Sequence, residues 1–236
     1  MDGISIITTS DGSHSLFHSK LNETYHSVHG ALQESQHVFI QQGLGFWTSQ
    51  NSMQEIRVLE IGFGTGLNAL LTLLYATRLP LKIYYESWEA HPLPPDLVRQ
   101  LNYGDLAGSN DFFSKIHATP WNQTVAISSN FSLHKIQGDI LKDTLNAPFN
   151  LIFYDAFGPA KQAEMWTMEI LKKVTDALAP RGVWVTYCAK GQVKRDLRVL
   201  KLNVETLQGP PGKKEMIRAS RGGLEIQDPC GSNTGI

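Results

Sequence analysis

The distribution of apolar residues along the chain predicts strands that alternate with helices. Five short apolar runs have the length of buried strands, and they lie at residues 56–61, 82–88, 131–136, 149–154 and 183–188. Apolar residues between these runs recur at helical spacing, which predicts helices near residues 65–79, from residue 96, and at 163–178 and 191–200. Such alternation predicts an α/β fold with a mostly parallel sheet. Residues 203–207 and 215–219 are expected to add an antiparallel hairpin.

The segments outside this alternating pattern indicate how the chain divides into an N-terminal extension, a core domain and a tail. Residues 1–55 are polar, with β-prone fragments around Asp11-Gly12 that predict a hairpin, and a short helix over residues 30–42 that ends at Gly43. We expect this N-terminal extension to pack on a core domain of residues 56–221. Within that domain, residues 103–130 are longer than an ordinary connection and are expected to be an insertion beside the site. The glycine-rich tail, residues 222–236, has no periodicity and is expected to be disordered.

Three glycines spaced two apart follow the first predicted strand. Gly62, Gly64 and Gly66 allow a sharp bend and a close approach to a ligand, and the next helix offers free N–H groups. A dinucleotide fingerprint would place its third glycine at position 67, where this chain has leucine, so NAD is disfavoured. With Glu60 two residues before Gly62, the pattern instead resembles the first motif of class I S-adenosylmethionine methyltransferases. A tight turn without a ligand is the alternative.

Acidic residues follow three further strands. Glu89 ends the second strand, where a carboxylate can accept hydrogen bonds from both ribose hydroxyls of a nucleotide, and Glu86 is the fallback inside the strand. Gly138-Asp139 follows the third strand, where methyltransferases often contact adenine, although turn chemistry also explains the pair. Asp155 ends the fourth strand, at the edge of the sheet where open α/β folds bind ligands.

The composition of the chain argues against a membrane protein, a disulfide-rich protein and a metal-binding protein. The 236 residues are 42% hydrophobic, which suits a single domain with additions, and no stretch is long and apolar enough for a membrane span. We therefore expect a cytoplasmic protein. Two cysteines and scattered histidines give no support for a disulfide framework or a metal site. The net charge is −1, yet residues 181–221 hold ten basic and three acidic residues, which suits a docked polyanion or, alternatively, a solvated helix face.

Three motifs together resemble one family, the methyltransferase part of MnmC. They are the glycine segment at residues 58–68, Asp155-Ala156-Phe157-Gly158-Pro159-Ala160-Lys161 with Met165-Trp166, and Gly212-Lys213-Lys214-Glu215-Met216. The match covers roughly residues 15–221. Ala156, Gly158 and Gln162-Ala163 depart from the usual pattern, which puts substrate detail in doubt.

The resemblance implies a Rossmann-like fold and methylation by S-adenosylmethionine of the primary amine of 5-aminomethyl-2-thiouridine at the tRNA wobble position. Only the methyl-transfer half is expected here, with a separate FAD-dependent oxidase as a potential partner. The residues that the resemblance and the motifs assign to the cofactor are Glu60, Gly62, Gly64, Gly66, Asn68, Glu89, Gly138, Asp139 and Asp155.

Methyl transfer to an amine needs a neutral, oriented nitrogen, and this requirement sets the expected roles of the remaining residues. Asp155 is expected to position the amine and to relay its proton, or alternatively to bind the amino group of the methionine moiety. Phe157 is expected to stack on the wobble base, with core packing as the alternative. The candidates for phosphate contacts are Lys161, Arg195, Lys213 and Lys214.

Two other functions stay open at this point. In a small-molecule amine methyltransferase, the basic C-terminal third would be incidental. In a binding module without turnover, the chain would hold the cofactor for a separate oxidase. Retention of Glu60, the three glycines and Asp155 together argues against a degenerate site.

Overall fold

The computed structural model describes residues 3–146 and 148–222. Apart from Gly222, the tail that the sequence predicts to be disordered lies outside the described residues. Among the residues described, no helix combines the length and apolarity that crossing a bilayer requires.

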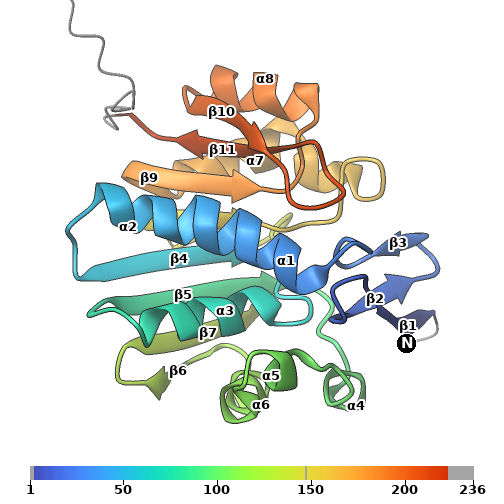
Figure 1. Cartoon of the computed structure of the whole chain (residues 1–236). Helices are drawn as coiled ribbons and strands as arrows, with labels where there is room; N and C mark the ends of the chain where they lie inside the picture. Colours follow the sequence, from blue (N-terminus) through green and yellow to red (C-terminus); the bar gives the residue numbers. More distant parts are fainter. Residues whose placement is uncertain (1–2, 147, 223–236) are drawn as a thin grey trace, which may run out of the picture.

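An eight-stranded sheet forms the centre of the fold, in the order β10-β11-β9-β8-β4-β5-β7-β6 (Figure 1). Its strands are β4 (Glu55–Ile61), β5 (Lys82–Glu89), β6 (Gln123–Ser128), β7 (Phe131–Gln137), β8 (Phe149–Tyr154), β9 (Leu178–Thr186), β10 (Asn203–Gln208) and β11 (Glu215–Ser220). The five strands from β9 to β7 run parallel, and β6, β10 and β11 are antiparallel to their neighbours. The predicted mostly parallel sheet and C-terminal hairpin are therefore confirmed.

The strand order reverses at β4, because β5 lies on one side of it and β8 on the other. Ile61 of β4 pairs with Tyr154 of β8, so the carboxyl ends of these two strands stand side by side. In open α/β sheets a ligand crevice forms at such a switch point.

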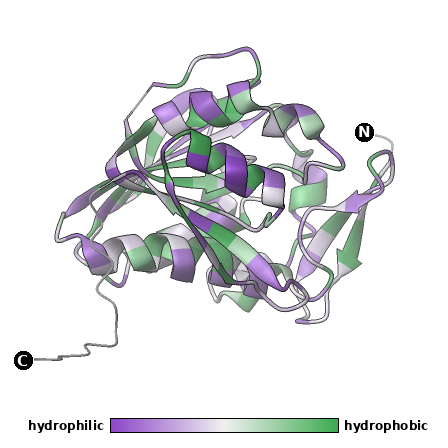
Figure 2. Cartoon of the chain, turned by 90° about the horizontal axis from the view of Figure 1, so that it is seen from above, coloured by the Kyte–Doolittle hydropathy of each residue, from purple (hydrophilic) through white to green (hydrophobic). Residues whose placement is uncertain are grey.

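Helices cover both faces of the sheet. They are α1 (Ala31–Ser35), α2 (Phe46–Gln50), α3 (Leu67–Ala76), α4 (Pro95–Val98), α5 (Tyr103–Leu106), α6 (Asn110–Ala118), α7 (Met168–Asp176) and α8 (Gly191–Val199), with a π-helical segment η1 (Gln36–Gly45) and a 3-10 turn η2 (Ala163–Trp166). One core joins the helices of residues 31–50, α3, α5 and α6 to the sheet, and a second joins α7 and α8 to it. In Figure 2 the inner strands are largely green, which marks hydrophobic residues, and the helices around them carry purple, hydrophilic residues as well as green ones.

The helix predicted to end at Gly43 continues instead to Gln50, as α1, η1 and α2 follow one another without a break. A Cβ on Gly43 would lie 3.1 Å from side-chain atoms of both Phe153 and Val185. The glycine therefore allows the helix to approach the sheet closely, and it does not act as a stop signal.

Residues 103–130, the expected insertion, form α5, α6 and the edge strand β6. One further sequence prediction was wrong in detail. The helix expected over residues 163–178 is divided at Thr167, whose Oγ1 accepts a hydrogen bond from the N–H of Ile170 (3.4 Å) and caps α7.

The N-terminal hairpin is confirmed. It pairs β1 (Ile4–Thr8) with β2 (His14–His18), and a third strand, β3 (Glu23–Thr24), extends it into a small sheet that the sequence did not predict. This small sheet lies at the carboxyl ends of the central strands (Figure 1). It is thereby placed to form a wall of the crevice at the switch point.

Candidate functional site

The glycine motif forms a left-handed bend between β4 and α3. Gly62, Gly64 and Gly66 have φ of 95°, 47° and 73°, a conformation that favours glycine. A Cβ on Gly62 would lie 2.8 Å from the carbonyl oxygen of Asp155, and one on Gly66 would lie 2.7 Å from His117 Nε2. The bend therefore needs glycine both for its backbone conformation and for its close contacts.

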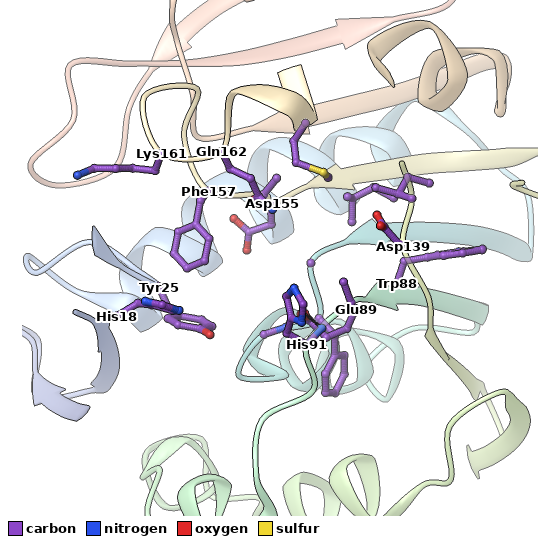
Figure 3. Close-up of a pocket in the computed structure, with 18 of the residues that line it drawn as sticks. His18, Tyr25, Trp88, Glu89, His91, Asp139, Asp155, Phe157, Lys161 and Gln162 are labelled. Atoms are coloured by element: carbon purple, nitrogen blue, oxygen red, sulfur yellow. Dashed lines mark hydrogen bonds between the residues drawn. The ribbon is translucent and has the colours of Figure 1, made fainter. Parts of the chain in front are cut away.

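A cavity of about 770 Å³ lies along the carboxyl ends of β4, β5, β7 and β8. Gly62, Gly64, Glu89, Gly138, Asp139 and Asp155 all line it, together with side chains of the small N-terminal sheet (Figure 3). The three-dimensional structure thus gathers most of the residues that the sequence assigns to a cofactor.

Glu89 joins the second strand to the glycine bend. Its Oε2 accepts a hydrogen bond from the N–H of Gly64 (2.9 Å), and its Oε1 accepts one from the N–H of His91 (2.8 Å). A carboxylate has about four acceptor positions, so two remain for ribose hydroxyls. Glu86, the fallback, is buried away from the cavity and accepts a hydrogen bond from Trp88 Nε1 (2.9 Å). The geometry therefore favours Glu89.

Asp139, which follows β7, and Trp88 of β5 line one wall of the cavity. Asp139 accepts a hydrogen bond from the N–H of Leu141 (3.0 Å) and pairs with Lys142 Nζ (2.9 Å), and the Lys142 ammonium is the main cause that lowers the pKa of Asp139. A Cβ on Gly138 would lie 3.0 Å from the Trp88 ring, so glycine allows the chain to pass close to the indole. The sequence reading missed Trp88, because it lies in an apolar strand and has the signature of a core residue.

Asp155 lies beside the glycine bend, and its carboxylate faces the cavity (Figure 3). Asn68 Nδ2, from the first turn of α3, donates a hydrogen bond to Asp155 Oδ2 (2.9 Å). Burial raises the pKa of Asp155 to about 7, and the negative charge of Glu34 adds to this effect. Near neutral pH, Asp155 can therefore both bind a proton and release it.

An aromatic group of Phe157, Tyr25 and His18 lies next to Asp155. The Phe157 ring meets Tyr25 edge-on at 5.1 Å and His18 at 6.4 Å between ring centroids. Phe157 follows β8, whereas Tyr25 and His18 belong to the N-terminal sheet region (Figure 3). Sequence reasoning missed Tyr25 and His18, because their segment carries no motif. The arrangement offers flat surfaces to a planar ring.

The four basic residues expected to contact phosphate differ in their exposure and in their contacts. Lys161 lines the cavity, points away from Asp155 and donates a hydrogen bond to the carbonyl of Asn22 (3.0 Å; Figure 3). Arg195, on α8, and Lys214, in the loop between β10 and β11, are exposed. Lys213 differs from the expectation, as it forms an ion pair with the buried Glu34 carboxylate.

The position of Lys213 has a physical reason. Its ammonium lies 3.7 Å from the centre of the Tyr187 ring, which adds a cation–π contact to the ion pair with Glu34. A contact between Lys213 and phosphate would have to break both interactions. We therefore assign Lys213 to the ion pair with Glu34 and not to the phosphate-binding set.

Glu60 also departs from its expected role as a cofactor ligand. Its side chain is fully buried, does not line the cavity, and accepts a hydrogen bond from Ser87 Oγ (2.5 Å). Asn68 reaches the cavity, but its amide is directed to Asp155. Within residues 3–146 and 148–222, no group of three or more His, Cys, Asp or Glu side chains could hold a metal ion.

Comparisons with known proteins identify the relatives of this chain. A family described as S-adenosyl-L-methionine-dependent methyltransferase matches residues 110–222. A protein of Pseudomonas fluorescens, named tRNA 5-methylaminomethyl-2-thiouridine biosynthesis bifunctional protein MnmC, is 30% identical over 210 residues, which are 84% of this chain and 32% of that protein. The MnmC protein of Cupriavidus necator is 28% identical over 85% of this chain. The chain thus spans about a third of the length of the curated relatives it matches.

Solved structures agree with this placement. The crystal structure of MnmC2 from Aquifex aeolicus superposes with a TM-score of 0.73 and 26% identity, over 93% of this chain and 71% of that one. Spermidine synthase from Thermotoga maritima gives a TM-score of 0.58 at 16% identity, over 94% of this chain and 71% of that one, and shares the fold alone.

Proposed function

Because the chain belongs to the S-adenosyl-L-methionine-dependent methyltransferases of the MnmC type, we propose that it methylates the primary amine of 5-aminomethyl-2-thiouridine at the wobble position of tRNA. The observation that carries this proposal is the carboxylate of Asp155, which faces the cavity beside the glycine bend.

The donor side of the cavity fits a bound S-adenosylmethionine. Gly62 and Gly64 line the cavity with bare backbone at the bend, and Glu89 keeps free acceptor positions for the ribose. Trp88 and Asp139 provide a flat wall and an acceptor for the adenine. When bound, the cofactor supplies an electrophilic methyl group on a sulfonium centre.

On the acceptor side, Asp155 binds the amine of the substrate, orients it and accepts its proton. An amine arrives mostly as an ammonium ion, and the ionised Asp155 accepts a charged hydrogen bond from it, which holds and orients the nitrogen. With a pKa of about 7, Asp155 can then take the proton that frees the lone pair. If Asp155 instead binds the amino group of the methionine moiety, its replacement will weaken cofactor binding before it slows transfer.

The aromatic group and the exposed cations complete the proposal for tRNA. Phe157, Tyr25 and His18 would receive the wobble base once it leaves the stack of the anticodon loop. Arg195 and Lys214 would contact phosphates around it. These contacts would place the aminomethyl group at Asp155.

The proposal is tested by incubating the protein with S-adenosylmethionine and tRNA that carries 5-aminomethyl-2-thiouridine, followed by mass analysis of the nucleosides. We expect a gain of one methyl group on that nucleoside, and none on tRNA with an unmodified wobble uridine. Methylation of free amines with no retention of tRNA on a filter would favour a small-molecule enzyme. Cofactor binding without a single turnover would favour a non-catalytic module.

The same proposal implies a source for the aminomethyl group on the tRNA and a cellular location for the reaction. The relatives are named bifunctional and this chain matches about a third of each, so we propose that another catalytic unit, such as an FAD-dependent oxidase, supplies the aminomethyl group. The site of action would be the cytoplasm, where tRNA is modified.

A further inference from the structure

Asp155, Ala156 and Phe157 form a short segment after β8, here called the acceptor segment, which carries the two side chains assigned to the substrate. Two side chains from elsewhere in the chain donate to its backbone. The Tyr187 hydroxyl donates a hydrogen bond to the carbonyl of Ala156 (2.9 Å), and Trp166 Nε1 donates one to the carbonyl of Phe157 (2.8 Å). Because a carbonyl oxygen only accepts, the direction of both bonds is certain. The path of the segment is therefore fixed by side chains that lie outside it.

Tyr187 stands directly after β9, the strand that pairs with β8. Its side chain is half-buried and lines the cavity. The two strands run parallel, so their carboxyl ends lie at the same edge of the sheet, and the phenol reaches from the end of one strand to the segment after the other. The sequence places Tyr187 inside an apolar strand and gives it no role.

The ring of Tyr187 is itself held from a third part of the chain. Lys213 Nζ lies 3.7 Å from the centre of the ring, and the same ammonium pairs with the carboxylate of Glu34. Glu34 is 4% exposed, and its Oε2 also accepts a hydrogen bond from the N–H of Ser27 (2.7 Å). Water and salt screen such a shielded ion pair weakly, so it holds the ammonium in place over the ring. Lys213, which the sequence assigns to phosphate, is thereby linked to the acceptor segment.

We propose that Tyr187 is a positioning residue for methyl transfer: its hydroxyl fixes the acceptor segment, and Lys213 fixes its ring. This role rests on the proposed function. Methyl transfer needs the acceptor nitrogen in line with the donor. The directions of the Asp155 carboxylate and the Phe157 ring both depend on the backbone between them. By holding the carbonyl of Ala156, the hydroxyl keeps both side chains in one relative orientation before the substrate binds.

Two other roles of Tyr187 would behave differently in experiments. A hydroxyl that touches the substrate directly would slow methyl transfer when removed, but would leave the backbone of the acceptor segment unchanged. A residue that only packs the fold would lower the free energy of unfolding when altered, but would leave the rate of transfer unchanged. The rate and the motion of the segment therefore have to be measured on the same variants.

The first test is Tyr187→Phe in the full chain, which keeps the ring and its contact with Lys213 and removes the donor to Ala156. The single-turnover rate of methyl transfer should fall about tenfold, whereas the affinity for S-adenosylmethionine by calorimetry should stay within about twofold of the wild type. Tyr75→Phe is the matched control, because it removes the same group in the last turn of α3, where the hydroxyl bonds to Thr48 Oγ1 (2.9 Å). This control should keep the wild-type rate and affinity.

The second test is hydrogen–deuterium exchange with mass spectrometry, which needs neither tRNA nor turnover. The amides of Asp155, Lys161 and Gln162 donate to backbone carbonyls and report when the chain after β8 opens. In Tyr187→Phe the peptide of residues 155–162 should exchange about two- to tenfold faster, because one hydrogen bond that holds it is lost. In Tyr75→Phe this peptide should exchange as in the wild type.

The third test combines Glu34→Gln with Lys213→Met, which removes the support of the Tyr187 ring. Both charges are removed together, so no buried charge is left without its partner. Glu34 raises and Lys213 lowers the pKa of Asp155, so the double variant removes two opposing effects on that carboxyl. It should speed the exchange of residues 155–162 and slow methyl transfer, as Tyr187→Phe does.

Four results would overturn the inference: wild-type exchange of residues 155–162 in Tyr187→Phe, a wild-type rate in that variant, a loss of its cofactor affinity, or wild-type exchange in the double variant. A slower rate with unchanged exchange would assign the hydroxyl to direct contact with the substrate instead. If the wild type fails to methylate tRNA, the proposed function fails, while the exchange data still decide whether Tyr187 fixes the segment. If the double variant does not fold, Tyr187→Phe decides the question.

Discussion

Replacing Asp155 by asparagine should slow the enzyme and at the same time stabilise the fold. The substitution keeps the shape of the side chain and removes its charge and its ability to accept a proton. Loss of a positioned acid–base group typically costs about 10²- to 10⁴-fold in rate, so we expect a single-turnover rate lower by about that factor near pH 8. The cofactor affinity should remain, since Asp155 is assigned to the acceptor.

The gain in stability follows from the raised pKa of Asp155. The native state holds the proton up to about pH 7, whereas the unfolded chain releases it near its ordinary value of 3.8. Between these values the unfolded state binds fewer protons, so the free energy of unfolding falls as the pH rises and stays lower above about 7. Asparagine cannot ionise, so the free energy of unfolding of Asp155→Asn does not fall over this pH range.

The size of the effect follows from the same shift. About three pKa units at about 1.36 kcal/mol each set an upper limit of about 4 kcal/mol. Because the carboxylate faces a water-accessible cavity, screening reduces this to about 1–3 kcal/mol. Asp155→Asn should therefore equal the wild type in stability near pH 4 and exceed it by about 1–3 kcal/mol near pH 8.

Urea denaturation across this pH range, together with single-turnover methylation, measures both effects on one pair of proteins. Asp139→Asn is the matched control, because the pKa of Asp139 is lowered and its replacement should bring no gain in stability at high pH. A stability difference that does not vary with pH, or a full methylation rate in Asp155→Asn, would refute the assigned environment and role of Asp155.

Three other substitutions test the packing and the surface. Gly43→Ala should lower the free energy of unfolding by about 1–3 kcal/mol in urea, because its Cβ would press on two sheet residues; an unchanged midpoint would contradict the close helix–sheet contact. Gly62→Ala should weaken cofactor binding at least tenfold by calorimetry, because its Cβ would press on the carbonyl oxygen of Asp155 and strain a backbone with φ at 95°; wild-type affinity would count against a cofactor site at this bend. Replacing Arg195 and Lys214 together by alanine should weaken tRNA binding and reduce the slope of log binding constant against log salt concentration by about two. The exposed control Lys82→Ala should leave this slope unchanged, and a wild-type slope in the double variant would remove both residues from the interface.

The sequence by itself determined the parts of this protein that depend on local patterns. Apolar runs of strand length predicted the parallel strands, and the glycine bend could be recognised because a left-handed backbone requires glycine there. Asp155 and Glu89 were found because they directly follow such runs, and parallel strands bring their carboxyl ends to one edge.

Tertiary structure alone decided which distant residues meet at that edge. His18 and Tyr25 come from a segment without a motif, yet they contact Phe157 more than a hundred positions later. Lys213 has the pattern of a surface cation, but the buried carboxylate of Glu34 holds it in an ion pair. Glu60 has the pattern of a ligand, although it is buried below the bend. Periodicity reports which face a residue occupies, whereas partners and charge states depend on contacts between segments far apart in the chain, which no local pattern encodes.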